Sequence, residues 1–133
     1  MRFYVIMPVS SDERFNEKKA IIQSEARKSN LVAYFPLDEI QDKPFDLIST
    51  IKDLRNSQFV VADLSLERPS CYFELGLAQA LGKTTKLIAE EGTPIHQAQG
   101  RNRISFYKDL DEFRRTISKI LIAPEIHNCL EIA

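Results

Sequence analysis

Residues 59–83, FVVADLSLERPSCYFELGLAQALGK, decide the fold because they join a short apolar run to an apolar helix. The run from 58 to 63 is rich in β-forming residues and predicts a buried strand that ends at Asp63. A helix is expected to begin near Pro69 or Ser70, and most of its residues are apolar. One carboxylate, Glu74, lies among those apolar residues and requires an explanation.

Strand and helix patterns alternate along the rest of the chain. Further strands are predicted at 2–7, 31–35, 85–89 and 104–107. Three more helices are predicted from residues that recur on one side. The first is capped by Ser10 or Ser11 and carries Phe15, Lys19, Ile22 and Ala26 on one side. The second carries Phe45, Ile48, Ile51 and Leu54, and the third, over 109–121, carries Leu110, Phe113, Ile117 and Ile120 or Leu121. Residues 123–133 show no clear pattern and are interpreted as a C-terminal tail.

This alternation predicts an α/β domain over residues 1–122, built on a small doubly wound parallel sheet. We expect a flavodoxin-like (Rossmann-like) strand order and three α/β/α layers. In such sheets ligands bind beyond the carboxyl ends of the strands, where the strand order reverses. The segments to watch are therefore 7–11, 63–69 and 90–100.

Composition narrows the function classes. The chain has 133 residues, 44% of them hydrophobic, and a formal net charge of −1, which argues against binding driven by nucleic-acid phosphates. No apolar run approaches the roughly 20 residues of a membrane span, and the N-terminus does not resemble a signal peptide. A cytoplasmic protein is expected, with Cys71 and Cys129 as free thiols rather than a disulfide. With two histidines and no Cys-x-x-Cys, no metal or redox cofactor is predicted.

Glu74 shares a helix face with Cys71 and Leu77, so its carboxylate is expected to be partly desolvated. The nearby helix N-terminus stabilises a negative charge, typically by less than about 1 kcal/mol. Two interpretations follow: Glu74 is a tuned acid–base or nucleophilic carboxylate, or it only complements the helix dipole. Gly76, unfavourable inside a helix, suggests close approach of backbone or ligand, whereas Gly82 lies where a helix C-cap is expected.

The stretch 59–83 resembles the nucleoside 2-deoxyribosyltransferase-like superfamily, in which a strand ending in Asp precedes a helix that opens with Glu-Leu-Gly. The first strand and loop, FYVIMPVS, is similar to the same group. The superfamily is in turn related to Toll/interleukin-1 receptor-like domains that cleave NAD. The resemblance implies cleavage of the N-glycosidic bond between a base and a ribose or deoxyribose. The substrate is then a nucleoside, a nucleotide or NAD.

The same resemblance assigns catalytic roles to Glu74, Asp63 and Tyr4. Glu74 is implied to be the nucleophile or the stabiliser of an oxocarbenium-like centre. Asp63 is implied to orient the site, hold a sugar hydroxyl or protonate the base, unless it only caps a loop. Tyr4 is implied to position the carboxylate, unless its ring is simply part of the core.

Substrate-binding candidates come from the three strand-end segments and from the helix of Glu74. A guanidinium matches phosphate oxygens, so Arg101 and Arg103 can hold a phosphate, with surface exposure as the alternative. In the same loop His96, Gln97 and Gln99 can meet base edges or ribose hydroxyls. The predicted substrate-binding residues are Met7, Pro8, Ser10, Ser11, Ser65, Cys71, Arg101 and Arg103.

The sequence also departs from the deoxyribosyltransferase pattern. Its first loop is Met-Pro-Val-Ser rather than glycine-rich, and the segment SLERPS lacks an aspartate that many transferases carry. Hydrolysis therefore stays open beside base transfer. The alternative to an enzyme is a non-catalytic nucleotide-binding or Toll-like interaction module. A homo-oligomer that completes the site is a further hypothesis, with the tail and the apolar side of the third helix as contacts.

Overall fold

The computed structural model describes residues 1–36, 46–95 and 103–132, the last four of these by their backbone alone. Five parallel strands form one sheet in the order β2-β1-β3-β4-β5. The strands are β1 (Arg2–Ile6), β2 (Val32–Tyr34), β3 (Val60–Asp63), β4 (Thr85–Glu90) and β5 (Ser105–Tyr107). The helices are α1 (Phe15–Lys28), α2 (Leu47–Arg55), α3 (Pro69–Ala80), α4 (Leu110–Leu121) and α5 (Pro124–Ile132), with a 3-10 turn, η1 (Ser65–Glu67).

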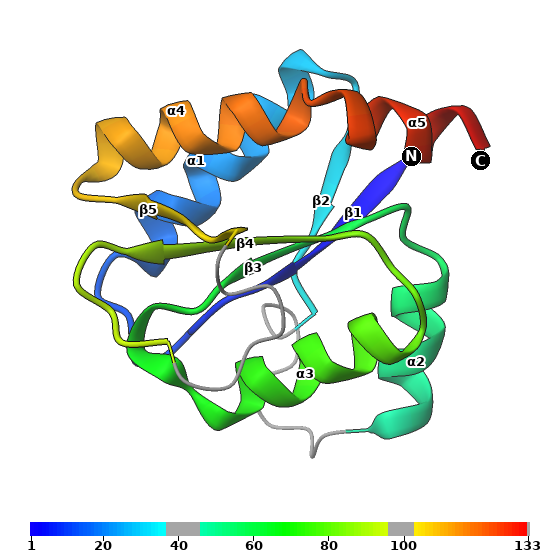
Figure 1. Ribbon diagram of the computed structural model, residues 1–133, viewed down its shortest axis with the longest axis horizontal. Helices are drawn as coiled ribbons and strands as arrows, with labels where there is room; N and C mark the ends of the chain where they lie inside the picture. The colour runs from blue at the N-terminus through cyan, green and yellow to red at the C-terminus, as the bar shows by residue number, and fades with distance from the viewer. Residues whose placement is uncertain (37–45, 96–102, 133) are drawn as a thin grey trace.

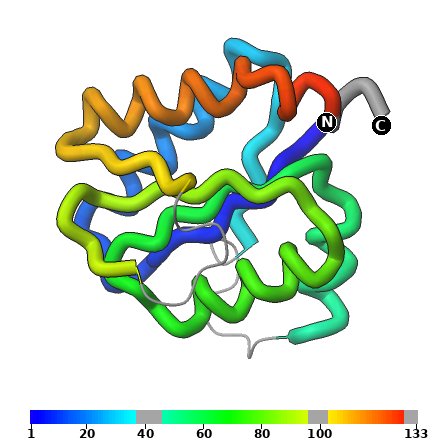
Figure 2. The backbone as a smooth tube through the Cα atoms, viewed as in Figure 1, coloured from blue at the N-terminus to red at the C-terminus, as the bar shows by residue number. Residues whose placement is uncertain are grey.

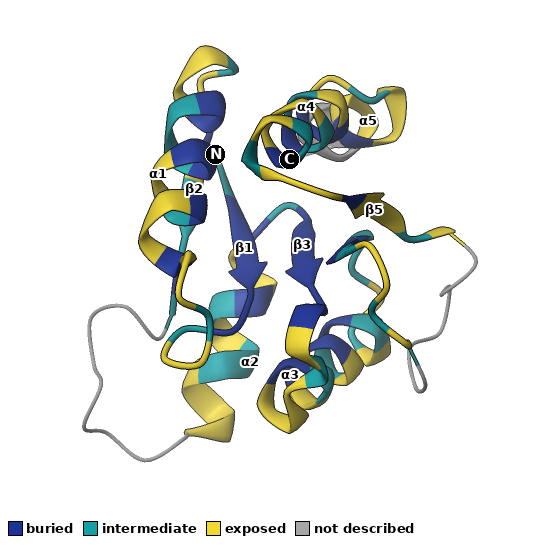
Figure 3. Cartoon of the chain, turned by 90° about the vertical axis from the view of Figure 1, so that its left-hand side faces the viewer, coloured by how far each residue is buried: buried dark blue, intermediate teal, exposed yellow. Residues whose placement is uncertain are grey.

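The predicted fold class is confirmed. Helices α1, α4 and α5 cover one face of the sheet and α2 and α3 cover the other, which gives three layers (Figure 1). The chain runs from β1 outward to β2 and then returns to β3 on the far side of β1, so the strand order reverses between β1 and β3 (Figure 2). The carboxyl ends of these two strands define the expected ligand-binding edge, which Figure 3 views.

Two apolar cores flank the sheet because successive strand residues point to opposite faces. In β1, Phe3 and Val5 pack with α1 and α4, whereas Tyr4 and Ile6 pack with α3. All four side chains are buried, as expected for a strand covered on both sides. A side chain on the Tyr4 face of β1 therefore meets helix α3.

Helix boundaries show which polar residues act as caps. The prediction that Ser10 or Ser11 caps α1 is wrong. Both serines are exposed, and α1 begins only at Phe15. The Asp12 carboxylate accepts a hydrogen bond from the Arg14 amide, at 2.8 Å, just before the helix. Gly82 does end α3 as expected. Its φ of +74° is left-handed, and the Gly82 and Lys83 amides donate to carbonyls of the last helical turn.

Three expectations differ from the structure. A Cβ added to Gly76 would meet nothing within 4 Å, so no described part of this chain approaches Gly76 closely. The predicted apolar side of α2 is only partly buried, since Ile48 is 79% exposed while Leu54 is fully covered. Residues 124–132 form helix α5 rather than an unpatterned tail, and Ile126 is buried in the core. Among the described helices, none has the length and hydrophobicity needed to cross a membrane.

Candidate functional site

Glu74 lies in the second turn of α3 with its side chain directed at β1. The residue is 6% exposed, and the Tyr4 hydroxyl donates to its Oε2 atom at 2.6 Å. Tyr4 reaches the carboxylate because its side chain leaves β1 on the face that α3 covers. The pair joins residues 70 positions apart, and its length is typical of a strong charge-assisted hydrogen bond.

Burial and the tyrosine act in opposite directions on Glu74. Desolvation raises the pKa of the carboxyl above its ordinary value, and the hydrogen bond from Tyr4 partly offsets this by stabilising the ionised form. Burial, reinforced by the Glu74 charge, raises the pKa of Tyr4 well above its usual range. Tyr4 therefore stays a hydrogen-bond donor to Glu74 throughout the physiological pH range.

Cys71 lies one helical turn before Glu74 and is a buried free thiol. Burial, with smaller contributions from the charges of Glu74 and Asp63, raises the pKa of this thiol to about 12. The thiol is therefore protonated and non-nucleophilic at neutral pH. Cys71 is therefore not expected to react, and its contact with the substrate stays a prediction.

A pocket opens where the first two strands end. The pocket is small and opens to solvent: its cavity volume of about 10 Å³ is roughly the room of one water molecule. Glu74 is the titratable residue among the described side chains of its wall. The other lining residues follow or belong to β1, α1 and β2: Val5, Ile6, Met7, Val9, Phe15, Phe35 and Pro36. A carboxylate in an apolar wall at the carboxyl edge of a parallel sheet lies where a ligand is expected to bind.

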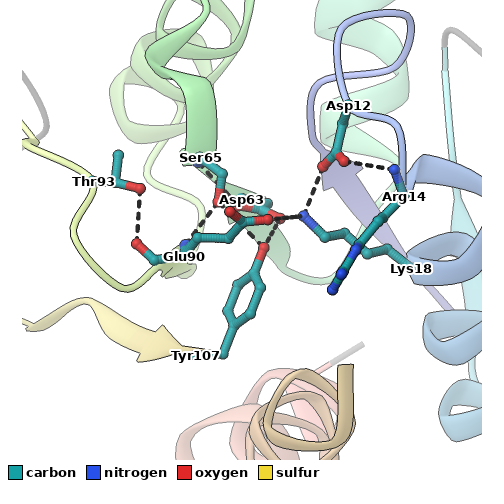
Figure 4. Close-up of polar contacts among 8 residues, drawn as sticks. All are labelled: Asp12, Arg14, Lys18, Asp63, Ser65, Glu90, Thr93 and Tyr107. Carbon is teal, nitrogen blue, oxygen red and sulfur yellow. Dashed lines mark hydrogen bonds and ion pairs between the residues drawn. The ribbon is translucent and has the colours of Figure 1, made fainter. Parts of the chain in front are cut away.

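Asp63 belongs to a second polar cluster beside β5. Its Oδ2 atom accepts from the Tyr107 hydroxyl at 2.6 Å, and its Oδ1 atom accepts from the Ser65 amide at 3.0 Å and the Ser65 hydroxyl at 2.7 Å. The Lys18 ammonium lies 3.5 Å from Oδ2 (Figure 4). Asp63 is only 2% exposed, and these partners take the place of the water that its carboxylate has lost.

Lys18 supplies the cation of this cluster. Its side chain is 0% exposed, and its ammonium lies 2.6 Å from Asp12 and 3.2 Å from Glu90. Although burial lowers the pKa of a lysine, the charge of Asp63 and the hydrogen bond to Asp12 outweigh it and raise the pKa of Lys18 above its ordinary value. The ammonium therefore remains charged in a site where its carboxylate partners compensate the desolvation.

The turn between β3 and α3 has an unusual backbone. Leu66 and Glu67 adopt φ angles of +69° and +43°, a left-handed conformation that costs roughly 1–2 kcal/mol for a residue with a side chain. Ser65 anchors the turn, since it donates to Asp63 and accepts the Glu90 amide at 2.7 Å. The Asp63 cluster thus holds the connection that leads into α3 and Glu74.

The predicted site residues separate into groups. Met7 and Glu74 line the pocket, and Pro8, which is buried, follows Met7. Tyr4 contacts Glu74 and belongs with Cys71 to the core beneath α3, but neither lines the pocket. Asp63 and Ser65 lie in the second cluster. The remaining predicted residues lie elsewhere. Ser10 and Ser11 are exposed on the loop before α1, and Arg103 lines a groove at the amino end of β4. Four residues lie outside the described part of the chain: His96, Gln97, Gln99 and Arg101.

Sequence reasoning did not identify Lys18, Asp12 or Tyr107. The pattern placed Lys19 on the inner side of α1, whereas Lys18 is the buried lysine and Lys19 is only half-buried. Lys18 lies three residues after the buried Phe15 and four before Ile22, so the same periodicity admits it. A charged residue is a poor candidate for a core position on composition alone, and its partners lie in other elements.

No group of three or more His, Cys, Asp or Glu side chains in the described parts of the chain is arranged to hold a metal ion. The fold and the pocket thus define an α/β protein with a buried carboxylate, Glu74, in a pocket at the ligand-binding edge of its sheet. Comparison of the sequence with protein-family models finds no match, and comparison with curated proteins finds none either.

Comparison of the structure with solved structures does find similar folds. One is a 2-deoxyribosyltransferase from the psychrotolerant bacterium Bacillus psychrosaccharolyticus, with a TM-score of 0.61 and 14% sequence identity. The match covers 88% of this chain and 96% of that chain. The fold implied by the sequence resemblance is therefore confirmed.

Proposed function

We propose that the protein cleaves the N-glycosidic bond of a nucleoside, a nucleotide or NAD, with Glu74 as the nucleophile. The observation that carries this proposal is the buried Glu74 carboxylate, held by Tyr4 at 2.6 Å on the wall of the pocket. The similarity in fold to a 2-deoxyribosyltransferase supports the choice of bond. Such a carboxylate suits attack on a sugar carbon because its ionised form is poorly hydrated.

In the first step, an oxygen of Glu74 attacks C1′ of the sugar and the bond between C1′ and the base nitrogen breaks. The base of a nucleoside or nucleotide leaves with that electron pair and takes a proton from water, whereas the nicotinamide of NAD leaves with it as a neutral molecule. In the second step, water or another base attacks C1′, gives up its proton, and releases the Glu74 carboxylate. Tyr4 donates to Oε2 in the free state, so it fixes the carboxylate and leaves Oε1 to react.

Asp63 is assigned a positioning role in this proposal. Its carboxylate already accepts from Ser65 and Tyr107 and lies beside the Lys18 ammonium. These contacts hold the carboxylate in place and direct its oxygens toward groups of the protein. Asp63 therefore organises the turn before α3, and Glu74 performs the chemistry.

Base release measured by chromatography tests the proposal. The panel contains ribo- and deoxyribonucleosides, their 5′-monophosphates and NAD, each incubated with and without a second free base as acceptor. Wild type is compared with Glu74→Gln, which preserves the shape of the side chain. Glu25→Gln is the matched control. Glu25, on α1, is also 6% exposed, but it is paired with Lys28 of the same helix and with Arg114 of α4.

We expect base release by wild type and Glu25→Gln and none by a folded Glu74→Gln. Release that requires the acceptor identifies a transferase, and release without it identifies a hydrolase. Saturable binding of a panel member with no release by wild type would instead identify a binding module. The hypothesis of a homo-oligomer stays a prediction, and the mass in solution measured by light scattering tests it.

A further inference from the structure

Lys18 joins three segments at the carboxyl edge of the sheet. Its ammonium contacts Asp12 in the loop after β1, Asp63 at the end of β3 and Glu90 at the end of β4. Figure 4 shows the lysine reaching across from α1 to this cluster. The side chain is fully buried and is not among the residues that line the Glu74 pocket.

One of the three segments borders the pocket, and a second leads into the helix of Glu74. The loop between β1 and α1 supplies Met7 and Val9 to its wall and is fastened to Lys18 through Asp12. The connection between β3 and α3 leads directly into the helix that carries Glu74. A loop of the pocket wall and the segment that leads to Glu74 are therefore attached to one buried ammonium.

The attachment to α3 passes through a short series of contacts. Lys18 and Tyr107 fix the Asp63 carboxylate, and Asp63 holds both the amide and the hydroxyl of Ser65. Ser65 precedes the left-handed pair Leu66 and Glu67, after which α3 begins. Residues in that conformation persist only where surrounding contacts determine it.

We propose that Lys18 is a positioning residue for Glu74, acting through Asp63 on the turn before α3 and through Asp12 on the loop after β1. Its effect on turnover rests on the proposed function, whereas its effect on the two loops does not. Removing the ammonium leaves the carboxylates of Asp12, Asp63 and Glu90 close together without a cation, and their repulsion loosens both loops.

Hydrogen exchange of backbone amides, read by mass spectrometry, tests the effect on the loops. Lys18→Met keeps the length of the side chain and removes its charge. Lys86→Met is the matched control, because it removes a lysine–glutamate ion pair, with Glu125, at the opposite end of the sheet. We expect exchange at 7–14 and 64–72 to become roughly 10-fold faster in Lys18→Met and to stay unchanged in Lys86→Met. Unchanged exchange there, or equal acceleration along the whole chain, would overturn the proposal.

Steady-state kinetics on the substrate found by base release test the effect on Glu74. We expect Lys18→Met to lower kcat roughly 10- to 100-fold, because the nucleophile is misplaced, and to change KM less than kcat, because the loosened loop supplies only Met7 and Val9 to the pocket wall. A wild-type kcat in folded Lys18→Met would overturn the positioning role. If wild type releases no base yet the two loops exchange faster in Lys18→Met, the proposed function fails and the positioning of the loops stands.

Asp12→Asn provides a second variant if Lys18→Met does not fold. It removes the negative charge of the closest partner of the ammonium and leaves Asp63 and Glu90 in place. We expect exchange at 7–14 to accelerate roughly 3-fold or more while exchange at 64–72 changes less. Exchange at 7–14 that matches wild type would overturn the proposed attachment of this loop.

Discussion

The molecule contains two buried tyrosine–carboxylate pairs at the same edge of the sheet, Tyr4 with Glu74 and Tyr107 with Asp63. Both hydrogen bonds are 2.6 Å long, and both carboxylates are at least nine-tenths buried. They differ in what else surrounds them. Asp63 has the Lys18 ammonium at 3.5 Å, whereas Glu74 lines a pocket and its pKa is raised by burial.

The difference separates a stabilising pair from a poised one. A buried carboxylate beside a cation and several donors loses little by being desolvated. A buried carboxylate with one neutral donor is held at a cost in stability, and that cost is characteristic of groups used in chemistry. Variants of the two pairs should therefore have opposite effects on activity and on stability.

The largest expected effect is on activity in Glu74→Gln. Without an ionised oxygen to attack C1′, base release should fall on the order of 10³-fold or more. The melting temperature should stay the same or rise, since the substitution removes a desolvated charge and retains an acceptor for Tyr4. Activity assays and thermal unfolding by circular dichroism check the two parts. A folded variant with wild-type activity would contradict the assignment of Glu74.

Asp63→Asn should mainly reduce stability. It leaves the buried Lys18 ammonium with fewer partners, and breaking a buried ion pair typically costs about 3–5 kcal/mol. Urea unfolding at neutral pH measures this loss. If Asp63→Asn is as stable as wild type, the contrast between the two carboxylates is wrong.

Matched tyrosine variants sharpen the comparison. Tyr4→Phe removes the donor that lowers the pKa of Glu74, so the acidic limb of the pH–rate profile should move to higher pH. Its rate should also fall roughly 10- to 100-fold, which corresponds to the ~1.5–3 kcal/mol of a hydrogen bond to a charged group. Tyr107→Phe should lower stability and leave that limb where it is. A shift of the limb in both variants would show that the pairs are not separable.

Stability as a function of pH should distinguish the pairs without kinetics. The folded-state pKa of Glu74 is raised, so protonation favours the fold and the stability it contributes is lost as pH rises through that pKa. The difference in unfolding free energy between Glu74→Gln and wild type should therefore be greatest at neutral pH and shrink toward the ordinary glutamate pKa of about 4.3. Urea titrations from acidic to neutral pH measure it, and a difference that grows in acid would contradict the sign.

The smallest expected effect comes from the helix that carries Glu74. Gly76→Ala should stabilise the protein by about 0.5–1 kcal/mol, because the added Cβ meets nothing within 4 Å and alanine favours helix. Base release should be unchanged, which makes this variant a control for the stability of α3 itself. Thermal unfolding checks the gain, and a loss of stability would reveal a close approach at Gly76.

The sequence predicted the sheet and one of the two pairs. Alternating strand and helix patterns were sufficient for the fold. The apolar neighbours of Glu74 indicated that its carboxylate is partly desolvated, and the family resemblance implied that Tyr4 positions it. The Lys18 cluster could not be predicted, because its members come from α1, β3, β4 and β5 and only the register of the sheet brings them together. Helix α5 was missed because it is short, and among its residues with described side chains, 124–128, Ile126 alone is buried, which leaves a weak periodic signal.

The position of β1 inside the sheet, between β2 and β3, has a consequence for how the chain folds. β1 pairs with β2 on one side and β3 on the other, yet β3 begins at residue 60 and α3 follows it. During synthesis on a ribosome, the first strand must therefore wait for nearly half of the chain before both of its edges are covered. Parallel pairings over such separations close slowly. Glu74 follows β3 in the chain, so its contact with Tyr4 becomes available only after the strands on both edges of β1 have been synthesised.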